Sequence, residues 1–180
     1  DSGHPFPFLT NHTINAIVRI FQIQPDGTKD YKIAILPIPS VLDRIIEIPS
    51  RGNKEHRFVY LEDVITYYAN QFFQGYGIED YMVFRITRDA DLEIDEEEAT
   101  DLLSEVEASL RRRRRGDAVR LEVCGEVKDN LLDFVLTSVE LEAKDVYRID
   151  GHLDCRMYFN FCNYPGLDHL RYVPFEPKLP

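Results

Sequence analysis

The stretch TINAIVRIFQIQPDGTKDYKIAILPI, residues 13–38, contains two runs rich in β-branched residues on either side of a turn sequence. The turn sequence PDGT combines proline, aspartate and glycine, the residues that tight chain reversals favour. We therefore predict a β-hairpin with strands at residues 13–24 and 31–38. The first strand is apolar on both faces, which is typical of a strand that is central or covered on both sides. Its two apolar faces are Ile14, Ala16, Val18 and Ile20 on one side, and Ile17 and Phe21 on the other.

The rest of the chain continues with short strands and then interleaves helices with strands. Further strands are predicted at residues 44–48, 57–61, 81–88, 118–124 and 145–150. Helices are predicted at residues 60–73, 128–141 and 153–163. In the strand at 118–124 we expect Val119, Leu121 and Val123 to point inward, with Arg120 and Glu122 outward. The class is α+β, an antiparallel or mixed sheet flanked by helices.

Residues 95–116, DEEEATDLLSEVEASLRRRRRG, predict a helix with an acidic first turn and an arginine-rich last turn. Asp95 stands where an N-cap is expected, and Gly116 stands where a C-terminal glycine is expected. The helix dipole favours this order of charges. It does not require five arginines, so a polyanion site remains an alternative. Its candidate residues are Arg111, Arg112, Arg113, Arg114 and Arg115.

The composition indicates one soluble globular domain in a cytosolic setting. The 180 residues are 44% hydrophobic and 29% charged, and no apolar run approaches the ~20 residues that a membrane-spanning helix needs. The net charge of −11 disfavours a dedicated nucleic-acid or membrane-surface protein. The three cysteines lack a CxxC spacing, which indicates reduced thiols. The first residues show no secretory signal.

Motifs that carry their own chemistry are not found in this sequence. Its five histidines form no HExxH or HxK pattern, and no phosphate-binding glycine loop or GxSxG elbow is present. We expect His4 and His12 to pack beside the apolar residues FPFL at 6–9. The pair Asp89 and Asp91 fits a turn or helix start, with cation binding as the alternative. From motifs alone, we predict no metal site and no self-contained catalytic site.

Several segments together resemble a known family. They are GHPFPFLTNHTINAIV at 3–18, YLEDVI at 60–65, FRITRDADLEIDEEEATDLL at 84–103, RRRRRGDAVRLEV at 111–123, VYRIDGHLD at 146–154 and LRYVPFEPKLP at 170–180. In this order they resemble the middle (or head) domain of bacterial polyphosphate kinase, the larger, histidine-phosphorylated type. The resemblance covers essentially all 180 residues.

The resemblance implies a fold and a parent reaction. Enzymes of this family reversibly move the terminal phosphate of ATP onto inorganic polyphosphate, through a phosphohistidine in phospholipase D-like C-terminal domains and with magnesium. Their middle domain is implied to have a phosphohistidine phosphatase-like (Janus-like) α+β fold, to make dimer contacts and to wall a tunnel. No catalytic, cofactor-binding or metal-binding residue of the family is carried onto this sequence, so ATP and Mg²⁺ would be held elsewhere in the parent. The expected layout is one domain over residues 1–180, with a leading segment at 1–12 and an exit linker at 164–180.

Two hypotheses from different classes follow. The first is an interaction domain that contacts the N-terminal and C-terminal domains of the same chain and a second copy, and lends arginines to a polyphosphate path. Arg85 and Arg88 are candidates for that path, with salt bridges to nearby acids as the alternative. Exposed aromatics among Tyr67, Phe73, Tyr158 and Phe161 would mark its interfaces. The second is a stand-alone phosphohistidine phosphatase-like hydrolase, which would need a cavity that combines a histidine with arginines.

Overall fold

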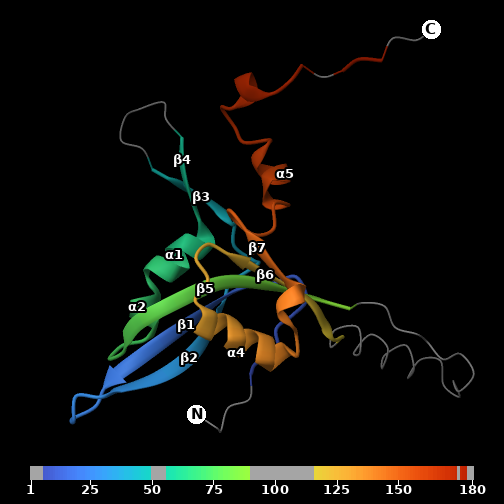
Figure 1. Cartoon of the computed structure of the whole chain (residues 1–180). Coiled ribbons are helices and arrows are strands. Elements are labelled where there is room, and N and C mark those ends of the chain that lie inside the picture. The colour runs from blue at the N-terminus through green and yellow to red at the C-terminus, as the bar shows by residue number, and fades with distance from the viewer. Residues whose placement is uncertain (1–5, 50–55, 90–115, 174, 178–180) are drawn as a thin grey trace, which may run out of the picture.

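The sheet at the centre of the molecule has five strands in the order β2-β1-β5-β6-β7 (Figure 1). A computed structural model describes residues 6–49, 56–89, 116–173 and 175–177. The strands are β1 (Ile14–Ile23), β2 (Lys29–Pro37), β5 (Gly77–Arg88), β6 (Ala118–Cys124) and β7 (Val146–Ile149). A separate two-stranded sheet pairs β3 (Ile45–Ile48) with β4 (Arg57–Tyr60). The prediction of an α+β fold with a mixed sheet flanked by helices is confirmed.

The predicted hairpin is present, and its first strand is internal as expected. β1 lies antiparallel to β2 on one side and to β5 on the other. The turn is closed by Asp26, whose carboxylate accepts hydrogen bonds from the backbone N–H of Thr28 at 2.9 Å and its hydroxyl at 2.6 Å. Gly27 adopts a φ of 85°, a left-handed value that glycine tolerates without steric cost.

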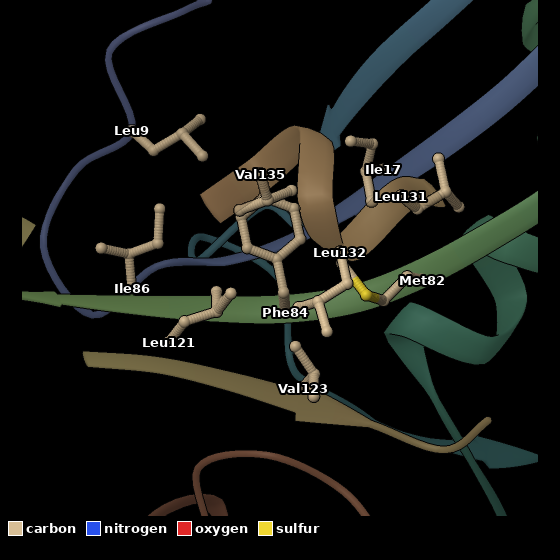
Figure 2. Packing of buried hydrophobic residues seen from close by; sticks show 10 residues of the cluster. All are labelled: Leu9, Ile17, Met82, Phe84, Ile86, Leu121, Val123, Leu131, Leu132 and Val135. Carbon is tan, nitrogen blue, oxygen red and sulfur yellow. The ribbon is translucent and has the colours of Figure 1, made fainter. Parts of the chain in front are cut away.

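β5 and β6 are antiparallel, whereas β6 and β7 are parallel. A parallel pair needs a crossover connection, and α4 (Asp129–Val139) supplies it here. α4 packs on one face of the sheet (Figure 1), where its buried leucines and valine meet the inward side chains of three strands. The buried members of this cluster, shown in Figure 2, are Leu9, Ile17, Met82, Phe84, Ile86, Leu121, Val123, Leu131, Leu132 and Val135.

The opposite face of the sheet is covered by α1 (Leu61–Tyr67) and by the loop that follows β7. Leu61 and Leu153 from these elements pack against Ile14, Ala16 and Val83. Both faces of β1 are therefore buried, which explains why its sequence is apolar without alternation.

Two helix predictions are wrong in part. The stretch 60–73 forms α1 and a separate short helix, α2 (Ala69–Phe72), because Tyr68 leaves helical geometry with ψ at 12°. The helical spacing predicts one apolar stripe of Leu61, Val64, Ile65, Tyr68 and Phe72, but Tyr68 and Phe72 are 47% and 60% exposed. The last helix, α5 (Met157–Phe161), is shorter than predicted. Two 3₁₀ turns, η1 (Ala143–Asp145) and η2 (Asp168–Leu170), complete the described elements.

The exposure predicted for two residues of β6 is also wrong. Val119 is 48% exposed, and Glu122 is buried. The Glu122 carboxylate is paired with Arg85 of β5 and Arg120 of β6, and Arg85 in turn contacts Asp154 in the loop after β7. The strand bounds themselves agree with the prediction.

The end of β5 and the start of β6 approach each other closely, and we call this contact between residues 88–89 and 116–117 the neck. The N–H of Asp89 donates to the carbonyl of Asp117 at 2.8 Å, and the guanidinium of Arg88 donates to the carbonyl of Gly116 at 2.9 Å. A Cβ atom at Gly116 would overlap the carbonyl oxygen of Asp89. The predicted helix at 95–116 lies, apart from Gly116, outside the described residues.

Replacing Gly116 by Ala is expected to destabilise the protein by about 1–3 kcal/mol, since the backbone of the neck must move to admit the methyl group. Urea unfolding followed by circular dichroism measures the change. Asp117→Ala is the control, since this neighbouring exposed side chain meets no such barrier and should change stability by less than ~0.5 kcal/mol. Equal stability of Gly116→Ala and the natural chain would contradict the close approach.

Candidate functional site

Arg85 lies on β5 with its side chain on the face opposite Met82, Phe84 and Ile86, as the strand period predicts. It is only 15% exposed. Its Nε donates to Glu122 at 2.5 Å, and its Nη1 lies 3.4 Å from a carboxylate oxygen of Asp154. The alternative of a salt bridge is therefore the one that the structure shows, with partners from β6 and from the loop after β7.

Arg88 is directed at the protein itself. Its Nε donates to the carbonyl of Leu9 at 3.0 Å and its Nη1 to that of Gly116. The guanidinium also lies 4.6 Å from the ring centre of Phe8. Burial lowers the pKa of Arg88. This arginine ties the leading segment to the end of β5.

The structure does not describe the other five candidates, which are Arg111, Arg112, Arg113, Arg114 and Arg115.

A buried ion pair lies beside α1. The Glu62 side chain is 3% exposed and accepts three contacts from Arg44, with Nε at 3.1 and 3.0 Å and Nη2 at 2.5 Å. Arg44 also donates through Nη1 to the backbone carbonyl of Asp154 at 2.9 Å. His152 approaches the same carboxylate at 3.3 Å and stacks on the ring of Tyr60. These contacts connect α1, the start of β3 and the loop after β7.

Asp154 is the centre of this loop. Its backbone is left-handed, with a φ of 55°, a conformation that Asp adopts more readily than most residues. Its carboxylate accepts two hydrogen bonds from Arg156, both at 2.7 Å. These bonds, followed by the charges of Arg156 and Arg85, lower the pKa of Asp154 to about 2. Arg44, Arg85 and Arg156 therefore all contact Asp154.

A cavity of about 560 Å³ opens next to these ion pairs. Its polar lining consists of His12, Arg85, Glu122, His152, Asp154 and Arg156. We predicted that His12 would pack with the FPFL residues; instead it is exposed and lines the cavity. The motif search missed Arg44, Glu62, Asp154 and Arg156, because no local spacing connects them. Within the described ranges, no group of three His, Cys, Asp or Glu side chains could hold a metal ion.

A cluster of aromatic side chains joins the β3–β4 hairpin to α5 and the segment after it. Phe58 packs edge-on against Phe161 at 4.8 Å and against Tyr164 at 4.9 Å between ring centres. The hydroxyls of Tyr60 and Tyr158 are 2.6 Å apart, and this hydrogen bond raises the pKa of Tyr60 to about 12.

The four aromatics expected to mark interfaces differ in exposure. Tyr67 and Tyr158 are 79% and 38% exposed, whereas Phe73 and Phe161 are half-buried. Two further exposed rings, Tyr68 and Phe72, lie near Tyr67 at the junction of α1 and α2.

Residues 1–161 match the family model described as the polyphosphate kinase middle domain. The chain belongs to this family. The polyphosphate kinase of Pseudomonas putida is 35% identical over 181 residues, and that of Bacillus cereus is 39% identical over 184 residues. Both matches cover 100% of this chain, but only 25% and 26% of the relatives' own lengths.

The crystal structure of polyphosphate kinase from Porphyromonas gingivalis has a similar fold. The TM-score is 0.72 at 22% identity, and the match covers 99% of this chain and 24% of that one. At this identity the similarity supports the fold alone. This polyphosphate kinase middle domain thus spans about a quarter of the length of the relatives it matches. Among its described residues, no helix is long and apolar enough to cross a membrane.

Acid is expected to weaken this middle domain through Asp154. Because the folded-state pKa of Asp154 is depressed to about 2, its contribution is present above the unfolded-state value of ~4 and is lost as pH falls toward 2. We therefore expect stability to decline between about pH 4 and pH 2. Asp154→Asn should reduce stability at pH 6 and flatten this part of the pH profile. Urea unfolding at pH 6, 4 and 3 measures both effects, and parallel profiles for the two proteins would contradict them.

Proposed function

We propose that this chain is the middle domain of a polyphosphate kinase whose complete form reversibly transfers the terminal phosphate of ATP to inorganic polyphosphate. The family match over residues 1–161 is the observation that carries this proposal. The full coverage of this chain by polyphosphate kinases at 35% and 39% identity supports it. Magnesium and ATP would be held by the other parts of the enzyme, which would act in the cytoplasm.

Within that enzyme, we propose a structural role: contacts to the N-terminal and C-terminal domains, contacts to a second copy and part of the wall of a tunnel. The ion pairs support this role, since Arg44, Arg85 and Arg88 are all engaged with protein groups. Exposed Tyr67, Tyr68 and Phe72 offer an apolar surface of the kind that a neighbouring domain covers. The layout, a single domain with a leading segment at 1–12 and an exit linker at 164–180, stays a prediction. A Janus-like, phosphohistidine phosphatase-like relation of the fold also stays a prediction.

Domain replacement tests the proposed function. The corresponding quarter of the Bacillus cereus polyphosphate kinase is replaced by this chain, and ATP-dependent synthesis of polyphosphate is measured. The chimera should be active. The control replaces the same segment with that of the Bacillus anthracis enzyme. Activity of the control together with a soluble but inactive chimera would contradict the proposal.

Polyphosphate contact by Arg111–Arg115 is a further prediction. A variant with all five arginines replaced by Gln should bind polyphosphate more weakly, and its binding should depend less on salt, because each phosphate-bound cation releases counterions. Binding is measured over a salt series for the natural and variant proteins. Unchanged binding would leave these arginines with the role of ending a helix. Arg85 and Arg88 were candidates as well, and Arg88 is the weaker of the two because it donates to the backbone carbonyls of Leu9 and Gly116.

The stand-alone phosphohistidine phosphatase-like hydrolase is not favoured. The cavity does combine His12 and His152 with Arg85 and Arg156. However, both arginines are paired with carboxylates, and the matching relatives are kinases.

A further inference from the structure

The cavity beside Asp154 contains hydrogen-bond donors that the protein does not use. Arg85 engages the protein through Nε and Nη1, and Arg156 engages it through Nε and Nη2. A guanidinium has five N–H donors, so Nη2 of Arg85 and Nη1 of Arg156 remain without a partner among the described residues. The ring of His12 likewise has no hydrogen-bond partner in the described part of the chain. All three side chains line the same cavity.

The charges of the arginines and carboxylates that line the cavity balance each other. Its two carboxylates are each shared by two arginines. Arg85 and Arg120 contact Glu122 at 2.5 and 3.0 Å, while Arg85 and Arg156 contact Asp154 at 3.4 and 2.7 Å. Arg120 is not among the lining residues, so the lining holds two guanidinium groups, two carboxylates and two histidines. This local balance contrasts with the net charge of −11 for the whole chain.

The geometry of the arginines also suits one class of ligand. Planar guanidinium groups present N–H pairs that match the oxygens of a phosphate group. Arg85 is held in place by contacts on two sides, and Arg156 is held by two parallel hydrogen bonds to Asp154. Their positions are thus set before a ligand arrives, which lowers the entropic cost of binding. The cavity, at about 560 Å³, falls in the range of roughly 300–1,000 Å³ that small ligands occupy.

We propose that this cavity binds a phosphate group, with Nη2 of Arg85, Nη1 of Arg156 and the ring of His12 as its donors. Asp154 acts as an internal anion that holds both arginines and moderates the affinity. Free inorganic phosphate and a phosphate group of a polyphosphate chain share this chemistry. Binding of polyphosphate rests on the proposed function, whereas binding of inorganic phosphate does not.

Hydrogen–deuterium exchange on the whole protein that contains this chain tests the site, because it reports binding peptide by peptide. The probes are inorganic phosphate and tripolyphosphate, each added over a concentration series. Peptides that cover residues 151–156 should become protected. Protection by inorganic phosphate would identify a site for the free anion, and protection by tripolyphosphate alone would identify a site for the chain. No protection at either probe up to about 10 mM, well above a weak millimolar Kd, would overturn the proposal.

Variants assign the protection to the named donors. Arg156→Gln should raise the half-saturating concentration by about tenfold or more, the loss expected for a charge-assisted hydrogen bond. His12→Gln should raise it less. Arg171→Gln is the matched control, because it removes the same charge from an exposed pair with Asp168 and does not line the cavity. Equal effects of Arg156→Gln and Arg171→Gln would overturn the proposal.

Asp154→Asn gives a test in the opposite direction. Asn also accepts left-handed backbone, and the variant frees both arginines from the internal carboxylate, so the half-saturating concentration should fall. A weaker site in this variant, with its fold intact, would overturn the role given to Asp154. If this variant does not fold, the comparison of Arg156→Gln with Arg171→Gln still tests the proposed phosphate site. Failure of the domain replacement would leave binding of inorganic phosphate standing, and failure of the exchange experiment would leave the kinase proposal standing.

Discussion

Replacing Glu62 by Gln is expected to lower the free energy of unfolding by about 3–5 kcal/mol, the usual cost of removing one partner of a buried ion pair. Glu62 is 3% exposed and Arg44 14%, so the remaining guanidinium would stay out of water without its counter-charge. Part of the loss comes from His152, which approaches the same carboxylate. The effect is large because three chain segments meet at this one side chain.

Urea unfolding of single and double variants measures this effect. Glu62→Gln and Arg44→Met should each be strongly destabilising, whereas Arg44→Met combined with Glu62→Leu should recover much of the loss, because no uncompensated charge remains. Asp168→Asn is the control, since that carboxylate is 76% exposed in its pair with Arg171 and should cost no more than about 1 kcal/mol. If Glu62→Gln lowers the free energy of unfolding by less than ~1 kcal/mol, the Arg44 guanidinium must become hydrated when its partner is removed, which would contradict the prediction.

Replacing Phe84 by Ala is the second large effect, with an expected loss of about 3–5 kcal/mol. Phe84 is fully buried on the central strand β5. Figure 2 shows its ring pointing from β5 toward Val135 of α4. Removing the ring deletes buried apolar contacts and leaves a cavity between the sheet and α4, which the rigid strands around it fill only in part.

Tyr81 on the same strand is the control for this prediction. It is 51% exposed, so Tyr81→Ala should cost about 1 kcal/mol or less. Both variants are measured by urea unfolding, with the slope checked for unchanged two-state behaviour. Similar losses in the two variants would mean that the packing of α4 on β5 contributes little to stability.

The strands were predictable because their signals are local. β6 was predicted with its observed bounds, and the β1–β2 hairpin follows from its two apolar runs and the turn at Asp26 and Gly27. The helix at 60–73 was predicted too long, because helical spacing alone does not show that Tyr68 ends α1. Helical spacing places Tyr68 and Phe72 on the apolar stripe of this helix, and both rings are nevertheless exposed.

The candidate site could be predicted only in part. Arg85 was named from its face of the strand, but its partners depend on register and on a distant loop. Glu122 lies directly opposite Arg85 across the β5–β6 ladder, and Asp154 arrives from beyond β7. A single sequence does not give strand register, so Glu122 was expected to face solvent. His12 was expected to pack, because nothing nearby in sequence indicates the cavity that it lines.

The neck at Asp89 and Gly116 has a consequence for evolution and engineering. Because β5 and β6 are joined there by backbone and arginine hydrogen bonds, we expect their pairing to depend only weakly on how much chain connects them. The entropic cost of closing a connection grows slowly, by about 0.6 kcal/mol for each doubling of its length. Homologues can therefore differ in length between these two residues while the sheet stays the same. We expect the domain to tolerate a reporter protein inserted between them, because both ends of the insertion would be held at adjacent strand ends.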